Sequence, residues 1–375
     1  MEMKKQNLFA ILFLSMGMFL TTACSDDESD KEDGGDSKIT AEMLDKVIVT
    51  YVDKTVIPTY ALMDEKVEAL DNAVKTFISS GNQNDLDAAC DAWRAARKPW
   101  EESEAFLYGP ADYENLDPSL DSWPLQKDDI DQILATQDFS SLDDDTEDAQ
   151  GVRGYHTLEY LLFNDGKPKV ATTVTSNEKG YMQRVSARLL KDAQRLHKAW
   201  SEGLGTTEVP TAFGQEMKDH NGRLSSAAHV VSTIIDDGIK NIADEVGSQK
   251  IANPYNYWKS GEKEQAVLEV ESWYSWNSLV DYEDNIISIE NSYLGGREGS
   301  RDKATSMSAL VKSVDESLDS RVKEQLTATR KAIRNIPAPF RSNLGATTEI
   351  EAAMKACSEL SNIFTEVANA LEVNN

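Results

Sequence analysis

Residues that break helices are scarce in this sequence, which has 20 glycines and 10 prolines among 375 residues. No stretch keeps the sustained polar and apolar alternation of a half-buried strand. Long runs instead place apolar residues three or four positions apart, which is typical of amphipathic helices. The sequence therefore predicts an all-α protein.

The sequence also lacks an excess of positive charge and the common zinc motifs. Its formal net charge of -27 argues against a basic face, so we expect no nucleic-acid partner. It has no CxxC pair for a thiolate zinc site and no HExxH motif of a helical zinc protease. Cys90 and Cys357 leave one disulfide open, because spacing alone does not show whether they meet.

The N-terminus has the pattern of an export signal rather than of a folded domain. Two lysines precede an apolar run at residues 8–20, which is too short to span a membrane. The run leads to LTTAC at residues 20–24, which resembles a lipobox and implies a lipid on Cys24 that attaches the protein to a membrane. The acidic residues that follow resemble the export signal of surface lipoproteins. We expect an outer-membrane lipoprotein that faces the periplasm or the cell surface.

The rest of the chain divides into two sets of predicted helices. The first set covers residues 41–79, 85–106, 151–163 and 178–200, and the second covers 212–246, 262–293, 303–336 and 348–371. A long loop at 111–124 separates the second and third helices of the first set, and Pro58 and Pro99 predict kinks or breaks. Four helices in each half favour two bundles with a cleft between them. The domain plan is a signal peptide, an acidic tether and two bundles, at residues 1–23, 24–38, 39–205 and 206–375.

One motif combines a histidine and a carboxylate on a predicted helix. In the segment GYHTLE, His156 and Glu159 are three residues apart and therefore project from one face. An imidazole beside a carboxylate suits a metal ion or a proton-transfer pair. Glu101 and Glu104, also three apart, offer further oxygen donors from a neighbouring helix. Such a mixed set suits iron, manganese or zinc.

Four sequence blocks carry a family resemblance. They are the segment WRAARKPWEESEAF at 93–106, DSWP at 121–124, the GxHxxE motif at 154–159, and ESWYSWNSLVDYEDN at 271–285. With these blocks in order, the chain resembles the imelysin-like lipoproteins, which are classified with peptidase family M75. The resemblance covers most of the chain after residue 23.

The resemblance implies a fold and a position for the site. It implies two α-helical bundles, related as a distant duplication, with a site where they meet beside GxHxxE. The resemblance also implies that the activity of the family is unsettled. The family name comes from a claimed insulin-cleaving membrane protease, while relatives are iron-regulated or accompany iron-uptake systems. Surface or iron-uptake proteins are therefore implied partners.

Three functions stay open. The first is binding of a divalent or iron cation, or of a metal-containing ligand, through His156, Glu159, Glu101 and Glu104. The second is a metal-dependent peptidase. The third is a surface scaffold or adhesion module in which the cluster is structural, with His156 and Glu159 bonded to each other or paired with Arg97 or Arg153. The residues expected to line the interdomain cleft are Arg97, Gly154, Glu271, Ser275, Ser278 and Asn285, of which the last four would share a helical face.

Overall fold

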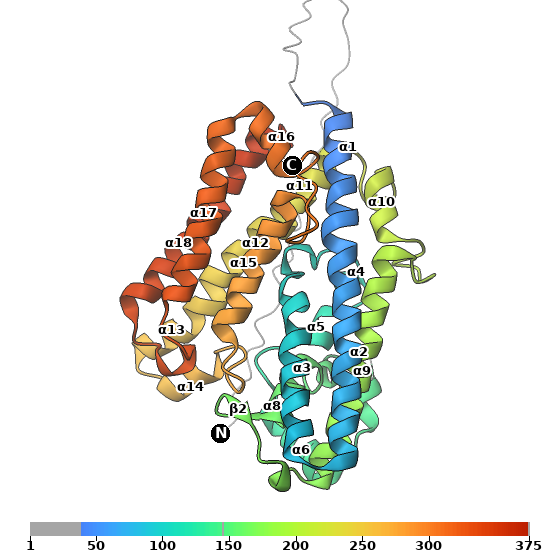
Figure 1. The fold of residues 1–375 in the computed structure, drawn as a ribbon, viewed down its shortest axis with the longest axis vertical. Coiled ribbons are helices and arrows are strands. Elements are labelled where there is room, and N and C mark those ends of the chain that lie inside the picture. Colours follow the sequence, from blue (N-terminus) through green and yellow to red (C-terminus); the bar gives the residue numbers. More distant parts are fainter. Residues whose placement is uncertain (1–38, 145, 374–375) are drawn as a thin grey trace, which may run out of the picture. The chain divides into compact units, whose positions relative to one another are not determined.

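Helices dominate the part of the chain that the structure describes, which comprises residues 39–144 and 146–373 of a computed structural model (Figure 1). Within those ranges the strands are β1 (Phe163–Asn164) and β2 (Lys167–Pro168), which form one short antiparallel hairpin. The predicted all-α class is confirmed. The signal peptide, Cys24 and the acidic tether lie outside the described residues.

The first half of the chain is built around three long helices that run side by side (Figure 1). They are α2 (Ile57–Ser80), α3 (Gln83–Glu101) and α9 (Ser176–Ser201). Local sequence sets their ends. Gly81, with φ of 65°, ends α2 in the left-handed region, and Asn82 accepts the Asp85 N–H to cap α3. Thr175 and Glu178 form a capping box at the start of α9.

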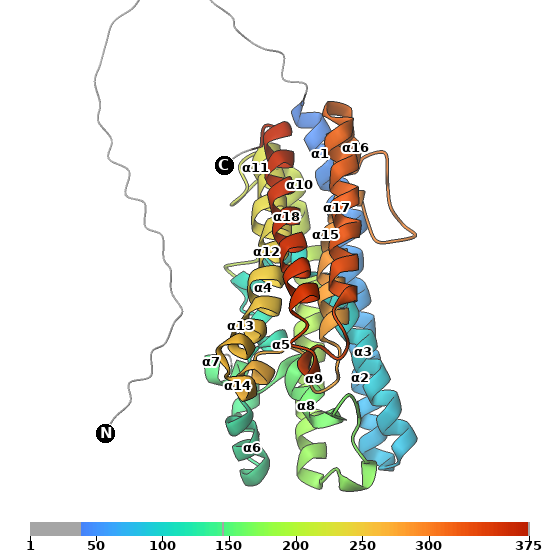
Figure 2. The ribbon, with the colours of Figure 1, turned by 90° about the vertical axis from the view of Figure 1, so that its left-hand side faces the viewer.

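The second half adds a layer in which α17 (Glu316–Asn335) and α18 (Thr347–Ala370) pack against each other (Figure 2). Between this pair and the first half lies α15 (Ser278–Leu294), which contacts both α17 and α3. Beside it runs a helical rod that combines α11 (Ala227–Thr233), α12 (Asn241–Glu245) and α13 (Ala252–Ser260). α15 therefore carries side chains into the contact between the halves.

Shorter helices connect these layers. They are α1 (Ala41–Thr50), α4 (Pro110–Tyr113), α5 (Asp117–Asp121), α6 (Lys127–Thr136), α7 (Glu147–Gln150), α8 (Gly154–Leu162), α10 (Phe213–Asp219), α14 (Lys263–Leu268) and α16 (Met307–Val314). No helix in the described ranges is long and apolar enough to cross a membrane. Cys90 in α3 and Cys357 in α18 are both buried free thiols, so the disulfide left open by the sequence does not form. The division into domains 39–205 and 206–375, and their relation by duplication, stays a prediction.

Helix interruptions differ from those predicted. The run of residues 41–80 stays helical, because a π-helical turn at Tyr51–Val56 links α1 to α2. Pro58 cannot donate to the Lys54 carbonyl, which instead accepts the Arg297 N–H at 3.2 Å. Pro99 likewise does not break α3, which continues to Glu101. The expected loop at 111–124 holds most of α4 and all of α5.

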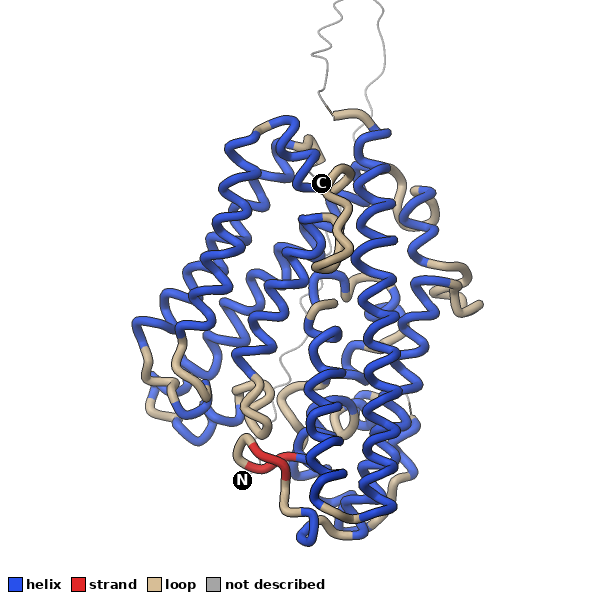
Figure 3. The backbone as a smooth tube through the Cα atoms, viewed as in Figure 1, coloured by secondary structure: helices blue, strands red, loops and turns tan. Residues whose placement is uncertain are grey.

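The predicted helix at 262–293 is wrong in its middle. Between α14 and α15 the chain forms a series of turns, in which Ser272 and Trp276 have φ of 52° and 63°. L-residues rarely adopt this conformation, so the helical period cannot continue through it. Figure 3 shows the loop beside the hairpin, where the Gly166 N–H donates to the Tyr274 carbonyl at 2.8 Å. Glu271 and Ser275 therefore do not share a helical face with Ser278 and Asn285.

A close backbone approach fixes the contact between the halves. Gly238 lies in the π-helical turn Ile234–Lys240, and a Cβ added there would be 2.2 Å from the Ala105 carbonyl oxygen. Ala105 belongs to the 3₁₀ turn Glu104–Phe106 that follows α3. Only glycine therefore allows this helix to pack so near the turn that carries Glu104.

We expect Gly238→Ala to lower the free energy of unfolding by about 1–3 kcal/mol, because the added methyl group overpacks this contact. The matched control is Gly180→Ala in α9, where the new Cβ would meet Phe139 at an ordinary 3.5 Å. That substitution should raise stability by about 0.5–1 kcal/mol through helix propensity. Urea denaturation measures both, and a stabilised Gly238→Ala would contradict the packing argument.

Candidate functional site

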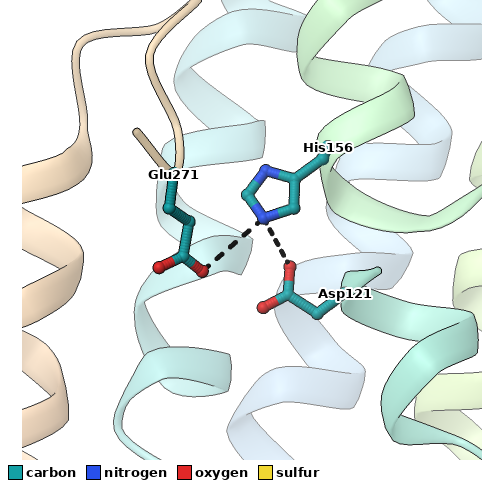
Figure 4. A group of neighbouring side chains, drawn as sticks. All are labelled: Asp121, His156 and Glu271. Atoms are coloured by element: carbon teal, nitrogen blue, oxygen red, sulfur yellow. Dashed lines mark ion pairs between the residues drawn. The ribbon is translucent and has the colours of Figure 1, made fainter. Parts of the chain in front are cut away.

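His156 lies at the centre of a cluster of charged side chains supplied by both halves of the chain. It sits in the first turn of α8, and its side chain is fully buried. Nδ1 lies 3.2 Å from Glu159 Oε2, one turn later in the same helix. On the other side of the ring, Nε2 lies 3.1 Å from Asp121 Oδ1 and 3.6 Å from Glu271 Oε1 (Figure 4). Each ring nitrogen therefore has its own carboxylate neighbour.

Glu159 is held by the loop that precedes α15. Its Oε1 accepts hydrogen bonds from the Ser275 N–H and the Ser275 hydroxyl, both at 2.7 Å. Its other oxygen faces His156 Nδ1, so both oxygens are engaged. An arrangement of this kind fixes the tautomer and orientation of an imidazole. The geometry makes Glu159 a positioning residue for His156.

Arg97 joins four segments through its guanidinium group. From α3 it pairs with Glu101 at 2.6 Å, Glu271 at 2.9 Å and Asp281 at 3.3 Å, and it also pairs with Asp121 at the end of α5. The side chain is fully buried, so these carboxylates replace the water that the cation has lost. Trp100 Nε1 donates to Asp121 Oδ2 at 2.7 Å and fixes the orientation of that carboxylate.

Lys250 is a second, partly buried cation in the cluster. Its Nζ lies 3.3 Å from Glu271 Oε2, 3.5 Å from Glu104 Oε1 and 4.0 Å from Glu101 Oε2. Asn285 Nδ2 donates to Glu101 Oε2 at 2.6 Å. The carboxylates of α3 and of the following 3₁₀ turn thus meet a lysine from the second half of the chain.

The residues expected to line the cleft are mostly buried. Arg97, Glu101, His156 and Glu159 are fully buried, and only 5% of Glu271 is exposed. Arg97 pairs with Glu101, Glu271 and Asp281, so part of the buried charge is compensated within the protein. The indole ring of Trp123 covers His156, with the ring centroids 4.6 Å apart.

Burial and charge push the carboxyl pKa values in opposite directions. Burial alone would raise the pKa of Glu271, but Lys250, His156 and Arg97 together lower it to about 2. Arg97 and His156 likewise outweigh burial and hold the pKa of Asp121 well below its usual value. For Glu101 and Glu104, burial prevails over the nearby cations and raises the pKa. The first two acids are therefore ionised at neutral pH, while the other two favour the protonated form.

His156 is poised between these effects. Burial alone lowers its pKa, but the Asp121 carboxylate, with hydrogen bonds to Asp121 and Glu159, raises it well above the usual value. Without a bound cation the imidazole is therefore protonated and donates to carboxylates on both sides. A cation at Nε2 would take the place of that proton.

The donor atoms form two overlapping groups that share one carboxylate. Asp121, His156 and Glu271 have donor atoms within 4.8 Å of one another, and so do Glu101, Glu104 and Asp121. The first group offers a nitrogen and two carboxylate oxygens, which fits iron, manganese or zinc. The structure thus separates His156 from Glu101 and Glu104 as possible ligands. The metal assignment itself stays a prediction.

The other residues expected at the site shape it without supplying donors to His156. The Ser278 hydroxyl donates to the Glu271 carbonyl at 2.6 Å and holds the turn that presents Glu271. Gly154 has φ of 87°, and a Cβ there would lie 2.3 Å from the Leu120 carbonyl oxygen. The glycine of the motif therefore brings α8 against the residue that precedes Asp121.

Asp121, Asp281 and Lys250 are members of the cluster that the sequence reasoning missed as site residues. Asp121 opens the DSWP block and Asp281 lies in the 271–285 block, so their positions in the blocks carried a signal. Lys250 lies in no such block, and no spacing rule connects it to Glu104, which is distant in the sequence. Its place in the site follows from tertiary structure alone.

Comparison with known proteins gives consistent matches over most of the chain. The family model described as Imelysin matches residues 56–367. Iron-regulated protein A of Synechococcus elongatus is 27% identical over 308 residues, which cover 82% of this chain and 80% of that protein. A crystal structure from Parabacteroides distasonis, provisionally named an iron-regulated protein A precursor, has a TM-score of 0.86 at 43% identity, covering 90% of this chain and 97% of that one. An imelysin-like protein from Psychrobacter arcticum shares the fold, with a TM-score of 0.62 at 13% identity over 89% and 95% of the two chains.

We expect Gly154→Ala to destabilise the protein by about 1–3 kcal/mol or more, because it combines a left-handed φ with a clash against Leu120. Gly205→Ala is the matched control, since Gly205 has φ of 68° but no neighbour within 4 Å of an added Cβ. Chemical denaturation should show a clearly smaller loss for the control. Equal losses would mean that the close approach of α8 to Leu120 contributes nothing.

A second prediction concerns the Lys98 and Asp284 pair at the same contact between halves, where Lys98 Nζ lies 2.7 Å from Asp284 Oδ1. Burial raises the pKa of Asp284 from 3.8 to about 7 despite Lys98. The folded protein therefore keeps a proton that the unfolded chain releases, and this contribution to stability is lost as the pH rises from about 4 to about 7.

Asp284→Asn should remove that pH dependence. Between pH 5 and pH 8 its melting temperature should fall by a few degrees less than that of the unchanged protein, as measured by circular dichroism. Asp91→Asn, at an exposed position of α3, should behave like the unchanged protein. Parallel pH profiles for all three proteins would be the contrary result.

Proposed function

This chain belongs to the imelysin family, and from that premise we propose that it binds one iron or similar divalent cation through Asp121, His156 and Glu271. The observation that carries the proposal is the convergence of a nitrogen and two carboxylate oxygens within 4.8 Å of one another. Relatives named as iron-regulated make iron the first cation to test.

The surroundings of His156 support metal binding. Glu159 accepts from Nδ1 and leaves Nε2 directed at Asp121 and Glu271, which is the usual relation between a carboxylate, a histidine and a metal ion. Ser275 in turn fixes Glu159 by two hydrogen bonds. The imidazole is thus oriented before any cation arrives.

The charge balance of the cluster also supports it. Besides Arg97 and Lys250, the cluster holds the buried carboxyl groups of Glu101, Glu104, Glu159, Glu271 and Asp281, and that of Asp121, whose side chain is 5% exposed. With His156 protonated, three positive charges oppose six acids. The remaining acids need protons or a further cation, because unpaired buried charges are costly. Binding of a divalent ion would therefore release protons from the cluster.

Arg97 opposes cation binding at His156. Its Nη2 lies 3.4 Å from His156 Nε2, and a like charge so near weakens cation binding. The guanidinium must turn its contacts toward Glu101 and Asp281 as Asp121 and Glu271 turn to the cation. We therefore propose a site for reversible binding rather than a permanently loaded centre.

The peptidase alternative has less support from this geometry. A hydrolytic zinc site keeps an open position for water and substrate, whereas His156 is covered by Trp123 and surrounded by buried acids.

We also propose, from the sequence alone, that a lipid on Cys24 holds the protein at the outer membrane, where it would work beside iron-uptake proteins.

The test is anaerobic calorimetric titration of tag-free protein with Fe²⁺. We expect one bound ion per chain, with binding lost in His156→Ala and weakened about 10–100-fold in Glu159→Gln, because Glu159 only orients the ring. His197→Ala is the matched control, since His197 also bonds a carboxylate, Asp64, at 3.2 Å, but far from the cluster. Equal affinity in the unchanged protein and His156→Ala would refute the site.

A further inference from the structure

The second group of donor atoms already has a positive charge beside it. Glu101, Glu104 and Asp121 bring carboxylate oxygens within 4.8 Å of one another, which is the spacing of a cation site. Lys250 extends from the π-helical turn Val246–Ile251 and places its ammonium 3.5 Å from Glu104 and 4.0 Å from Glu101. We propose that Lys250 limits the centre to a single metal ion by occupying the position of a second one.

The contacts of Lys250 are those of a shared counter-ion. Direct bonds between an ammonium and a carboxylate are about 2.7–2.9 Å long. Lys250 Nζ instead lies 3.3 Å or more from each of its three acids, which come from three separate segments. Two of these acids, Glu101 and Glu104, belong to the second donor group, so Lys250 is a shared counter-ion of that group rather than the partner of one member. A free cation in the same place would find the same oxygens.

The backbone of Lys250 and its side chain are both held in place beside these acids. The Tyr282 hydroxyl donates to the Lys250 carbonyl at 3.1 Å, which ties the π-helical turn to α15. Only 11% of the Lys250 side chain is exposed, so its charge is used inside the molecule. π-helical turns are rare and often lie at functional sites, and this one directs a lysine into the carboxylates.

Asp121 determines how a second ion would be placed relative to the first. It is the one residue common to both donor groups, so a second ion would share its carboxylate with the first. Bridged metal pairs in proteins are about 3.5–4 Å apart. Lys250 thus decides between a single ion beside His156 and a bridged pair. This inference rests on the proposed function, because it assumes that the first ion binds at His156.

The experiment is titration with Mn²⁺, followed by calorimetry and by electron paramagnetic resonance. The unchanged protein should bind one ion per chain with an uncoupled signal. Lys250→Met, which keeps an unbranched side chain one atom shorter and removes the charge, should bind two, and the second should produce an exchange-coupled signal. Lys98→Met is the matched control, because Lys98 also links two acids, Glu102 at 3.0 Å and Asp284 at 2.7 Å, outside the cluster. It should bind one ion.

A binding stoichiometry of one in Lys250→Met would overturn the inference. Glu104→Gln provides a second test that does not depend on how well Lys250→Met folds. If Lys250 excludes the second ion, Glu104 does not contact the bound one. Glu104→Gln should therefore bind Mn²⁺ with an affinity within about threefold of that of the unchanged protein. Loss of binding in Glu104→Gln would show that the ion uses the group assigned to Lys250, and would overturn the inference as well.

The two proposals fail in different ways. If the unchanged protein binds no ion, the His156 site is refuted, and the inference that rests on it is refuted as well. If the unchanged protein and Lys250→Met both bind one ion that His156→Ala abolishes, the His156 site stands and the role of Lys250 is refuted.

Discussion

The buried guanidinium of Arg97 is the constraint around which the contact between the halves is organised. A fully buried cation is stable only when carboxylates and hydrogen bonds replace its hydration, and removal of such partners commonly costs about 3–5 kcal/mol. Its partners come from α3, from the end of α5, from the loop after α14 and from α15. These four segments can therefore take only the arrangement in which their acids converge on α3. Glu271 and Asp121, brought together by Arg97, are also the acids nearest to His156 Nε2.

The same constraint explains why a structural network and the proposed binding site share residues. A buried ion-pair network stabilises the fold best when its charges balance, but this one keeps more acids than bases. Burial raises the pKa of Glu101 and Glu104, and neighbouring carboxylates add to that rise. The protons on acids at the centre of such a network are replaceable, since a cation can displace them. Under the proposed function, this imbalance separates the cluster from a purely structural contact.

Periodicity and punctuation in the sequence predict most helices, because each helix buries an apolar stripe and ends at glycine or proline. The GxHxxE motif also predicts that His156 and Glu159 share a face of α8, since i and i+3 positions are neighbours on any helix. The partners of His156 could not be assigned in this way. Asp121 and Glu271 reach it from distant segments, and Lys250 reaches Glu104 only because Gly238 lets the helices of the second half pack against Ala105. Contacts of this kind depend on tertiary packing, which local periodicity does not encode.

The broken helix between α14 and α15 shows why the sequence pattern was misleading at the site itself. Residues 271–278 carry a helical spacing of polar groups, yet Ser272 and Trp276 adopt φ values that cost of order 1–3 kcal/mol each. Within a helix, the Ser275 N–H would be bonded to the carbonyl four residues earlier. Outside a helix, that N–H and the hydroxyl both donate to Glu159 at 2.7 Å. The strained loop thus exchanges an internal helix bond for two bonds to a buried carboxylate, and that carboxylate orients His156. The local conformation is unfavourable by itself and is stabilised by the charge cluster that it completes.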